Sequence, residues 1–172
     1  LSGIGTNLDL RCWLRFDEGS GSSLVNSAST DYRAEVRSAA GTQWTNGVSG
    51  GALWLNGTDG YVVVPQSQGP VVTGGAFTVS AWVWQETNSA AVYPTLFSDS
   101  SWTGGADWLG YMLRFNTPHN RLIGIVGSGS QPAVEIWIPW WRERWSERWV
   151  HVALVHDGET TRLYVDGSLW DE

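Results

Sequence analysis

The stretch RWVHVALVHDGETTRLYVDGSLW, residues 148–170, decides the fold. The residues of its first arm alternate between two faces, as those of a half-buried β-strand do. One face carries Val150, Val152, Leu154 and His156, and the other carries Trp149, His151, Ala153 and Val155. Asp157-Gly158 and Asp166-Gly167 are dipeptides that favour tight hairpin turns. The stretch therefore predicts a meander of antiparallel strands.

Short apolar runs between clusters of Gly, Asn, Asp and Ser predict further strands upstream. We expect strands at residues 8–16, 74–86, 94–100, 110–116 and 121–128, and a hairpin at 51–65 with turns at Asn56-Gly57 and Asp59-Gly60. Many short strands with few helical patterns are typical of an all-β sandwich or barrel. No repeat or long linker divides the chain, so we expect a single domain over residues 1–172.

Composition excludes several classes of function. The net charge is −7, which disfavours a nucleic-acid partner and anionic membranes as partners. All ten basic residues are arginine, so Schiff-base chemistry on a lysine is excluded. No apolar run approaches 18 residues, so we expect no membrane insertion. Cys12 is the only cysteine, which excludes an intrachain disulfide and favours an inert, buried thiol.

Four motifs in a fixed order carry a resemblance to a known family: WLRFDEGSG (13–21), GALWLNGTDGYVVVP (51–65), FTVSAWVW (77–84) and WVHVALVHDGETTRLYVDG (149–167). Together they resemble a bacterial laminin-G-like domain of the concanavalin A-like lectin/glucanase superfamily. The resemblance implies a jelly-roll sandwich of two antiparallel sheets. It also implies a non-catalytic domain, outside the cell or at the cell surface, that binds glycans or proteins.

The family usually continues for a few strands beyond the LYVDG hairpin, whereas this sequence stops at Asp171-Glu172. We therefore expect either a C-terminally incomplete fragment or strand addition by another chain. That chain is a strand-donating partner or a second copy in a homo-oligomer. An unpaired edge would otherwise promote aggregation.

The segment IWIPWWRERWSERW, residues 136–149, holds five tryptophans, three arginines and two glutamates. Trp141, Trp145 and Trp149 recur every four residues, like one stripe of a short helix that packs onto the sandwich. The near-neutral charge of the segment counts against a nucleic-acid groove.

Two alternatives give this segment a binding role. In a sugar platform, Trp rings stack on sugar rings and arginines orient them. The residues of that platform are Trp140, Trp141 and Trp145 with Arg142 and Arg144. In a protein interface, Trp and Arg are the favoured anchors. Trp102, in a second Gly-rich loop, joins either surface.

Many laminin-G-like domains hold calcium near the rim of a sheet, and the resemblance implies a calcium site here. Calcium takes six to eight oxygen ligands. We expect Asp99 and Asp107 as ligands, with Asp17 and Asp59 as second choices. The alternative is that all four are ordinary turn acids.

The glucanases of the superfamily carry E-x-D-x-E or E-x-D-x-x-E on one strand, and this sequence has neither pattern. Glu135 has Trp137 and Pro139 at the partner positions, so we expect no catalytic residues and no enzyme. The sequence predicts a non-catalytic extracellular module for carbohydrate binding or adhesion. The alternative is a structural or assembly module of a surface fibre, an appendage or a virus particle that binds a neighbouring protein subunit.

Overall fold

The computed structural model describes residues 10–31, 33–65, 75–87, 91–104 and 107–172. The elements are nearly all antiparallel strands, which confirms the all-β class. The chain divides into two compact units, Leu1–Val71 and Val72–Glu172, here called the N-terminal and C-terminal units. Each unit is described by itself, and the single domain over residues 1–172 stays a prediction.

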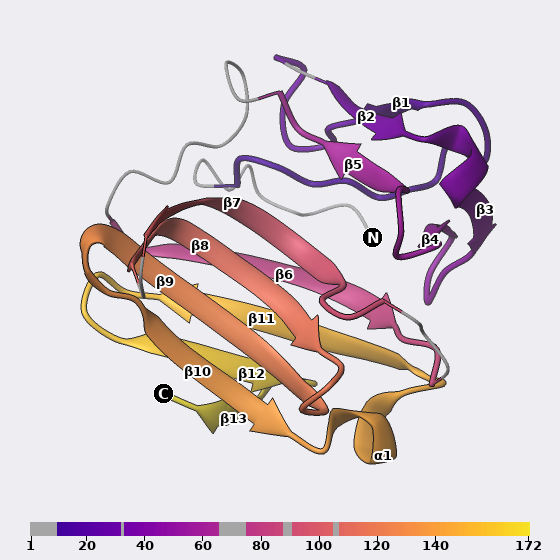
Figure 1. Ribbon diagram of the computed structural model, residues 1–172. Helices are drawn as coiled ribbons and strands as arrows, with labels where there is room; N and C mark the ends of the chain where they lie inside the picture. Colours follow the sequence, from indigo (N-terminus) through magenta and orange to yellow (C-terminus); the bar gives the residue numbers. More distant parts are fainter. Residues whose placement is uncertain (1–9, 32, 66–74, 88–90, 105–106) are drawn as a thin grey trace. The chain divides into compact units, whose positions relative to one another are not determined.

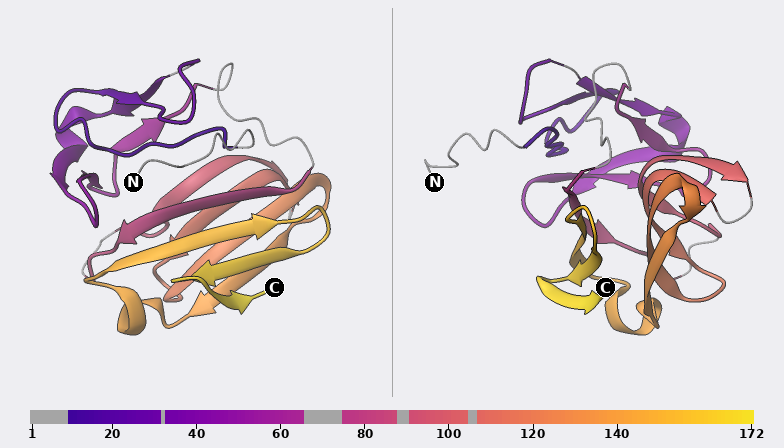
Figure 2. Two further views of the ribbon diagram at one scale, coloured as in Figure 1. Left: turned by 180° about the vertical axis from the view of Figure 1, so that it is seen from behind. Right: turned by 90° about the vertical axis from the view of Figure 1, so that its left-hand side faces the viewer.

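The C-terminal unit is a sandwich of two four-stranded antiparallel sheets, shown face to face in Figure 2. One sheet has the order β10-β9-β8-β7, and the other has the order β13-β12-β11-β6. The strands of the first sheet are β7 (Thr95–Gly104), β8 (Asp107–Asn116), β9 (Arg121–Pro132) and β10 (Val134–Pro139). Those of the second are β6 (Phe77–Trp84), β11 (Trp149–His156), β12 (Thr161–Val165) and β13 (Ser168–Asp171).

The alternation read from the sequence places the core between these two sheets. Three inward residues of β11, Val150, Val152 and Leu154, are fully buried, and they meet buried residues of β8, β9, β10 and β12 in one cluster. The close approach of the sheets is visible at Gly124, where an added Cβ would lie 2.7 Å from Cδ1 of Leu154. The outward residues of β6, including Trp82 and Trp84, are exposed as the alternation predicts.

The two predicted hairpin dipeptides behave differently. Asp166-Gly167 joins β12 to β13 in two residues with φ values of 47° and 79°, which is the left-handed geometry of a type I′ turn. Asp157-Gly158 begins a four-residue loop instead. There the Asp157 carboxylate accepts the backbone N–H of Thr160 at 2.8 Å and binds Arg162 at 2.6 Å. These bonds hold the pKa of Asp157 well below its usual range.

The N-terminal unit contains a three-stranded sheet, β1-β2-β5, and a two-stranded sheet, β3-β4 (Figure 1). Its elements are β1 (Ser23–Val25), β2 (Arg33–Arg37), the 3-10 turn η1 (Ala39–Gly41), β3 (Thr42–Asn46), β4 (Gly51–Leu55) and β5 (Tyr61–Val63). Leu24, Ala34 and Val36 form its small buried cluster.

The strand predicted at residues 8–16 is not formed in the described part, residues 10–16, apart from an isolated bridge between Leu14 and Asn26. The buried Asn26 side chain replaces a strand partner there. Its Oδ1 accepts the Trp13 N–H at 2.9 Å, and its Nδ2 donates to the Arg11 carbonyl at 3.1 Å. The alternation of exposure persists without a ladder, because Leu14 and Phe16 still pack against the core.

The predicted hairpin at residues 51–65 is also wrong, although both of its arms are strands. β4 pairs with β3, and β5 pairs with β2. The connection between the arms is an Asx loop, in which Asn56 Oδ1 accepts the N–H groups of Thr58, Asp59 and Gly60. The Asp59 carboxylate also accepts a hydrogen bond from the hydroxyl of Ser38 at 2.6 Å. The loop thus connects the β3-β4 sheet to the β1-β2-β5 sheet.

Among the described residues, no helix is both long enough and apolar enough to cross a membrane. Cys12 is a free cysteine with intermediate exposure, so it is less buried than predicted.

Replacing Leu154 by Ala is expected to lower the free energy of unfolding by about 2–5 kcal/mol, because it opens a cavity where the two sheets meet. The matched control is Ser80→Ala, on the exposed face of the neighbouring strand β6, which we expect to stay within about 0.5 kcal/mol. Urea denaturation measures both. Equal effects of the two variants would contradict the two-sheet core.

Candidate functional site

The Trp-rich segment joins β10 to β11 through one helical turn, α1 (Trp141–Trp145), at one end of the C-terminal sandwich (Figure 1). Asn120, in the turn between β8 and β9, holds the start of α1. Its backbone oxygen accepts the Trp141 N–H at 3.2 Å, and its Oδ1 accepts the Arg142 N–H at 2.8 Å. Asn120 and Trp140 both adopt left-handed backbone conformations, with φ values of 52° and 53°.

Trp141 and Trp145 belong to the core, with exposed fractions of 1% and 6%. The Trp141 ring lies 5.2 Å from the Phe115 ring and 5.0 Å from the Trp145 ring, measured between centroids. Neither tryptophan offers a free ring face, so the sugar-stacking role predicted for these two residues is incompatible with the structure. The helical-stripe interpretation describes both of them.

The exposed tryptophans of this end of the sandwich surround one arginine. Trp140 is 61% exposed and Trp170, on β13, is 43% exposed. The Arg144 guanidinium carbon lies 6.0 Å from the Trp140 ring centroid and 5.3 Å from that of Trp170. It also lies 5.5 Å from the ring of Trp145, which packs edge-on against Trp170. We call Trp140, Arg144 and Trp170 the Trp–Arg surface.

A second contact between a tryptophan and an arginine involves β10. The Arg121 guanidinium carbon lies 4.9 Å from the ring centroid of the half-exposed Trp137. The backbone N–H of Trp137 donates to Asp171 Oδ2 at 2.9 Å, which ties β10 to β13 and hence to Trp170. Sequence reasoning did not select Trp170, Trp137 or Arg121 for binding. The alternation of Trp137 with the buried Ile136 and Ile138 on β10 is the signal that would have found Trp137.

The acids of the Trp-rich segment accept hydrogen bonds from residues outside the segment. Glu143 accepts a bond from Asn120 Nδ2 at 2.6 Å, and this bond is the main reason why the pKa of Glu143 is lowered. Glu147 Oε1 accepts the backbone N–H of Thr87 at 2.6 Å. Within the described ranges, neither Arg142 nor Arg144 forms an ion pair with a carboxylate. Arg144 therefore lies against tryptophan rings and not in an ion pair with a described carboxylate.

The remaining predicted site residues lie on β7 and β8. Trp102 lies on β7 and Asp107 lies on β8. In the β7–β8 ladder, Trp102 pairs with Trp108 and Asp107 pairs with Gly104. Their side chains lie outside what the structure describes. Asp99 is exposed on β7, opposite Tyr111. None of the three is brought to the Trp–Arg surface by a described contact.

The calcium site at Asp99 and Asp107 stays a prediction. Among the residues that the structure describes, no group of three His, Cys, Asp or Glu side chains gathers as metal ligands would. The two second-choice acids already have partners. Asp17 accepts the Gly51 N–H at 2.9 Å and pairs with Arg15, and Asp59 binds Ser38 and Asn56. These bonds are those of loop-stabilising acids.

A comparison with known protein families finds a match. The family model Laminin_G_3, described as the concanavalin A-like lectin/glucanases superfamily, matches residues 56–172, which is more than half of the chain. The matched residues include all strands from β5 onward and the whole Trp-rich segment. A search of curated proteins finds no match.

Replacing Asn120 by Asp is expected to raise the pKa of Glu143, because the substitution removes the amide donor and adds a negative charge. An aspartate still accepts the Arg142 N–H and tolerates the left-handed backbone, so α1 is retained. A carbon-detected NMR titration of the Glu143 carboxyl measures the shift. Since its folded pKa is lowered, Glu143 stabilises the native protein above its unfolded pKa, and this contribution is lost as the pH falls through the folded pKa.

The matched control is Asn116→Asp in the same turn. Asn116 Oδ1 accepts the His119 N–H, which an aspartate preserves, and the side chain makes no described bond to Glu143. We expect a much smaller change in the pKa of Glu143. If both variants shift it equally, the Asn120 hydrogen bond is not the cause.

Proposed function

Because the chain belongs to the concanavalin A-like lectin/glucanase superfamily, we propose that it is a non-catalytic carbohydrate-binding module that acts outside the cell. Domains of this superfamily are often carbohydrate-binding or adhesion modules, and laminin-G-like domains are typically extracellular. We assign the binding of sugar to the Trp–Arg surface.

The observation that carries this proposal is the position of Arg144 among three tryptophan rings, two of them exposed. A tryptophan offers a large, rigid apolar face at a small cost in side-chain entropy, and pyranose rings have apolar C–H faces of matching size. Contact with the rings fixes the guanidinium, whose N–H groups donate to sugar hydroxyls. Arg144 is thus a preorganised donor between two stacking faces.

Calcium at Asp99 and Asp107 stays a prediction of the resemblance, and the binding measurement tests it directly. Sugar binding at the Trp–Arg surface by itself requires no metal. Binding that EDTA leaves unchanged therefore agrees with this surface, and binding that EDTA abolishes would favour the calcium site.

A second function, an adhesive or assembly module that contacts a neighbouring protein, is favoured by the outer face of the β6-β11-β12-β13 sheet. Trp82 and Trp84 of β6 are each nearly half exposed there. Trp82 packs edge-on against His151. Exposed clusters of large apolar side chains are typical of interaction surfaces. In this second function, the neighbouring protein is a subunit of a surface fibre, an appendage or a virus particle.

Replacing Trp140 by Asn and Trp170 by Ala is expected to weaken glycan binding by at least about tenfold each, because each removes an exposed stacking face. Asparagine is chosen at position 140 because it tolerates the left-handed backbone of that residue. A glycan array run in calcium and in EDTA identifies the ligand, and isothermal titration calorimetry of that ligand measures the loss.

The matched control is Trp82→Ala, an exposed tryptophan on the outer sheet face. We expect it to retain glycan affinity. Affinity that survives both Trp140→Asn and Trp170→Ala would remove the Trp–Arg surface from the proposal, and the absence of binding to any glycan would remove the function itself.

The assembly function predicts self-association that depends on the outer sheet face. Size-exclusion chromatography with light scattering on the full chain should then give an oligomer in which Trp82→Ala shifts the equilibrium toward monomer. A monomer at high protein concentration would argue against assembly through a second copy.

A further inference from the structure

The edge strands of the C-terminal sandwich differ in how well they are protected from pairing with another chain. The edges are β7 and β10 in one sheet and β6 and β13 in the other. β10 carries Glu135 and ends at Pro139, and β13 has only four residues. β7 carries Asp99, and its ladder with β8 is interrupted by two register shifts. Charges, prolines, bulges and short length are the features that protect an edge strand.

The edge strand β6 has none of these protective features. Its eight residues, FTVSAWVW, include no charged residue and no proline. Its register with β11 continues without a shift from Phe77 to Trp84. Among the described residues, β6 pairs with β11 on one side and with no strand on the other. Because alternate residues of an antiparallel strand bond to one neighbour, the remaining residues of β6 direct their N–H and C=O groups to the free edge.

The core is also less closed at β6 than at the edge strand β10. The inward residues Phe77, Val79 and Val83 of β6 pack against the core cluster but are only partly buried. By contrast, Ile136 and Ile138 of β10 are 5% and 1% exposed. A strand added beside β6 would cover the inward apolar side chains and pair the free backbone groups at the same time. The edge of β6 therefore offers both the polar and the apolar contacts of an interface.

The geometry points to a second copy of this chain as the partner: we propose that two chains pair through β6, antiparallel and about a two-fold axis normal to the sheet. Such an axis joins the two β6 sheets into one continuous sheet and keeps the core face of each copy on the same side. Like charges directly opposite each other destabilise a ladder. Since β6 carries no charge, pairing with its own copy avoids that cost.

The alternation of β6 limits the register of this pairing. Core-facing residues must lie opposite core-facing residues, so the two longest ladders place either Ala81 or Ser80 on the axis. With Ala81 on the axis, Val79 lies opposite Val83 of the second copy. Apolar side chains then meet on the core side of the sheet, and the smallest of them lies at the axis.

The outer face favours the same register. With Ala81 on the axis, Trp82 lies opposite Ser80 of the second copy, and Trp84 lies opposite its Thr78. Each nearly half-exposed ring then covers a small exposed side chain. With Ser80 on the axis, Trp84 lies beyond the end of the ladder. We therefore assign the register that has Ala81 on the axis.

The pairing goes beyond carbohydrate binding, which does not require it, and it gives the assembly function a defined contact. It deepens that second function and rests on it. A single strand edge is smaller than the interface of a stable dimer, so we expect a dissociation constant on the order of micromolar.

The first test is sedimentation velocity of the full chain over a range of protein concentrations, which should show a monomer–dimer equilibrium. Ser80→Lys and Ser80→Glu each place like charges near the axis and are each expected to weaken the dimer by about tenfold or more. An equimolar mixture of the two variants should dimerise again, because opposite charges then approach each other. The matched control is Ser168→Lys, at an exposed position on β13, the opposite edge of the same sheet, and it should associate like the wild type.

The second test uses disulfide cross-linking in a Cys12→Ser background, which removes the free cysteine. Ala81→Cys places two thiols directly opposite each other at the axis. Ser80→Cys leaves its two Cβ atoms about 7–8 Å apart as diagonal neighbours, whereas a disulfide needs about 3.5–4.5 Å. We expect mild oxidation to link Ala81→Cys and not Ser80→Cys on a non-reducing gel. Because Ala81 faces the core side, a contact between two outer sheet faces would not link it.

The outcomes separate this proposal from the proposed functions. A wild-type chain that stays monomeric at every concentration overturns the pairing, and so does a Ser168→Lys variant that dissociates as readily as Ser80→Lys. Linking of Ser80→Cys without linking of Ala81→Cys overturns the assigned contact, even where the chain is a dimer and the assembly function stands. The Ser80 variants decide the matter if Ala81→Cys does not fold. Ser80→Lys should keep glycan affinity, and a dimer that binds no glycan supports the pairing while it contradicts carbohydrate binding.

Discussion

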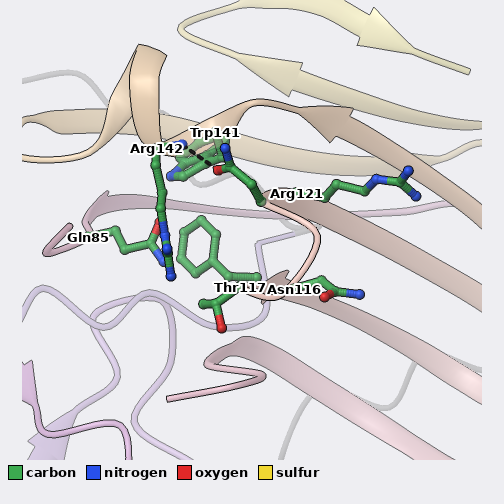
Figure 3. A pocket seen from close by; sticks show the side chains of 8 residues that line it. Gln85, Asn116, Thr117, Arg121, Trp141 and Arg142 are labelled. Atoms are coloured by element: carbon green, nitrogen blue, oxygen red, sulfur yellow. Dashed lines mark hydrogen bonds between the residues drawn. The ribbon is translucent and has the colours of Figure 1, made fainter. Parts of the chain in front are cut away.

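The burial of Trp141 is the constraint on which the candidate site depends. Its ring packs between Phe115 of the first sheet and Trp145 of α1, and so a five-residue helix that would be unstable alone is held against the core. With Trp141 fixed, Trp140 is exposed at the surface, and Arg142 reaches toward Gln85 and Thr117 (Figure 3). One buried indole thus fixes the positions of the two residues beside it.

Strands such as β6 and β11 could be predicted because each has one more buried face, so that the period of the apolar residues is visible in the sequence. The strand β10 was not predicted. The N-terminal unit was less predictable because side chains replace backbone partners there. Asn26 substitutes for a strand beside Trp13, and Asn56 closes a loop that resembles a hairpin turn in sequence. Neither substitution has a periodicity, and both depend on contacts that form only in the folded chain.

The candidate site was predicted in part for the same reason. The four-residue spacing of Trp141 and Trp145 indicated a helical stripe, but spacing does not tell which side of a helix meets the core. The partner that completes the surface, Trp170, is separated from Arg144 by two strands and reaches it through the β12–β13 turn. Pairings of this kind follow from sheet topology, which a single sequence does not state.

The hydrogen bond between the Asp171 carboxylate and the backbone N–H of Trp137 bears on aggregation through the edge of the sheet. β10 is the edge strand of its sheet, and edge strands with free N–H groups recruit strands from other molecules. Here a carboxylate occupies one of these donors and places a negative charge beside the ladder. A strand added at this edge would have to displace the carboxylate from the Trp137 N–H, and the negative charge would repel the backbone carbonyls of that strand. Asp171 therefore hinders the addition of a strand at this donor.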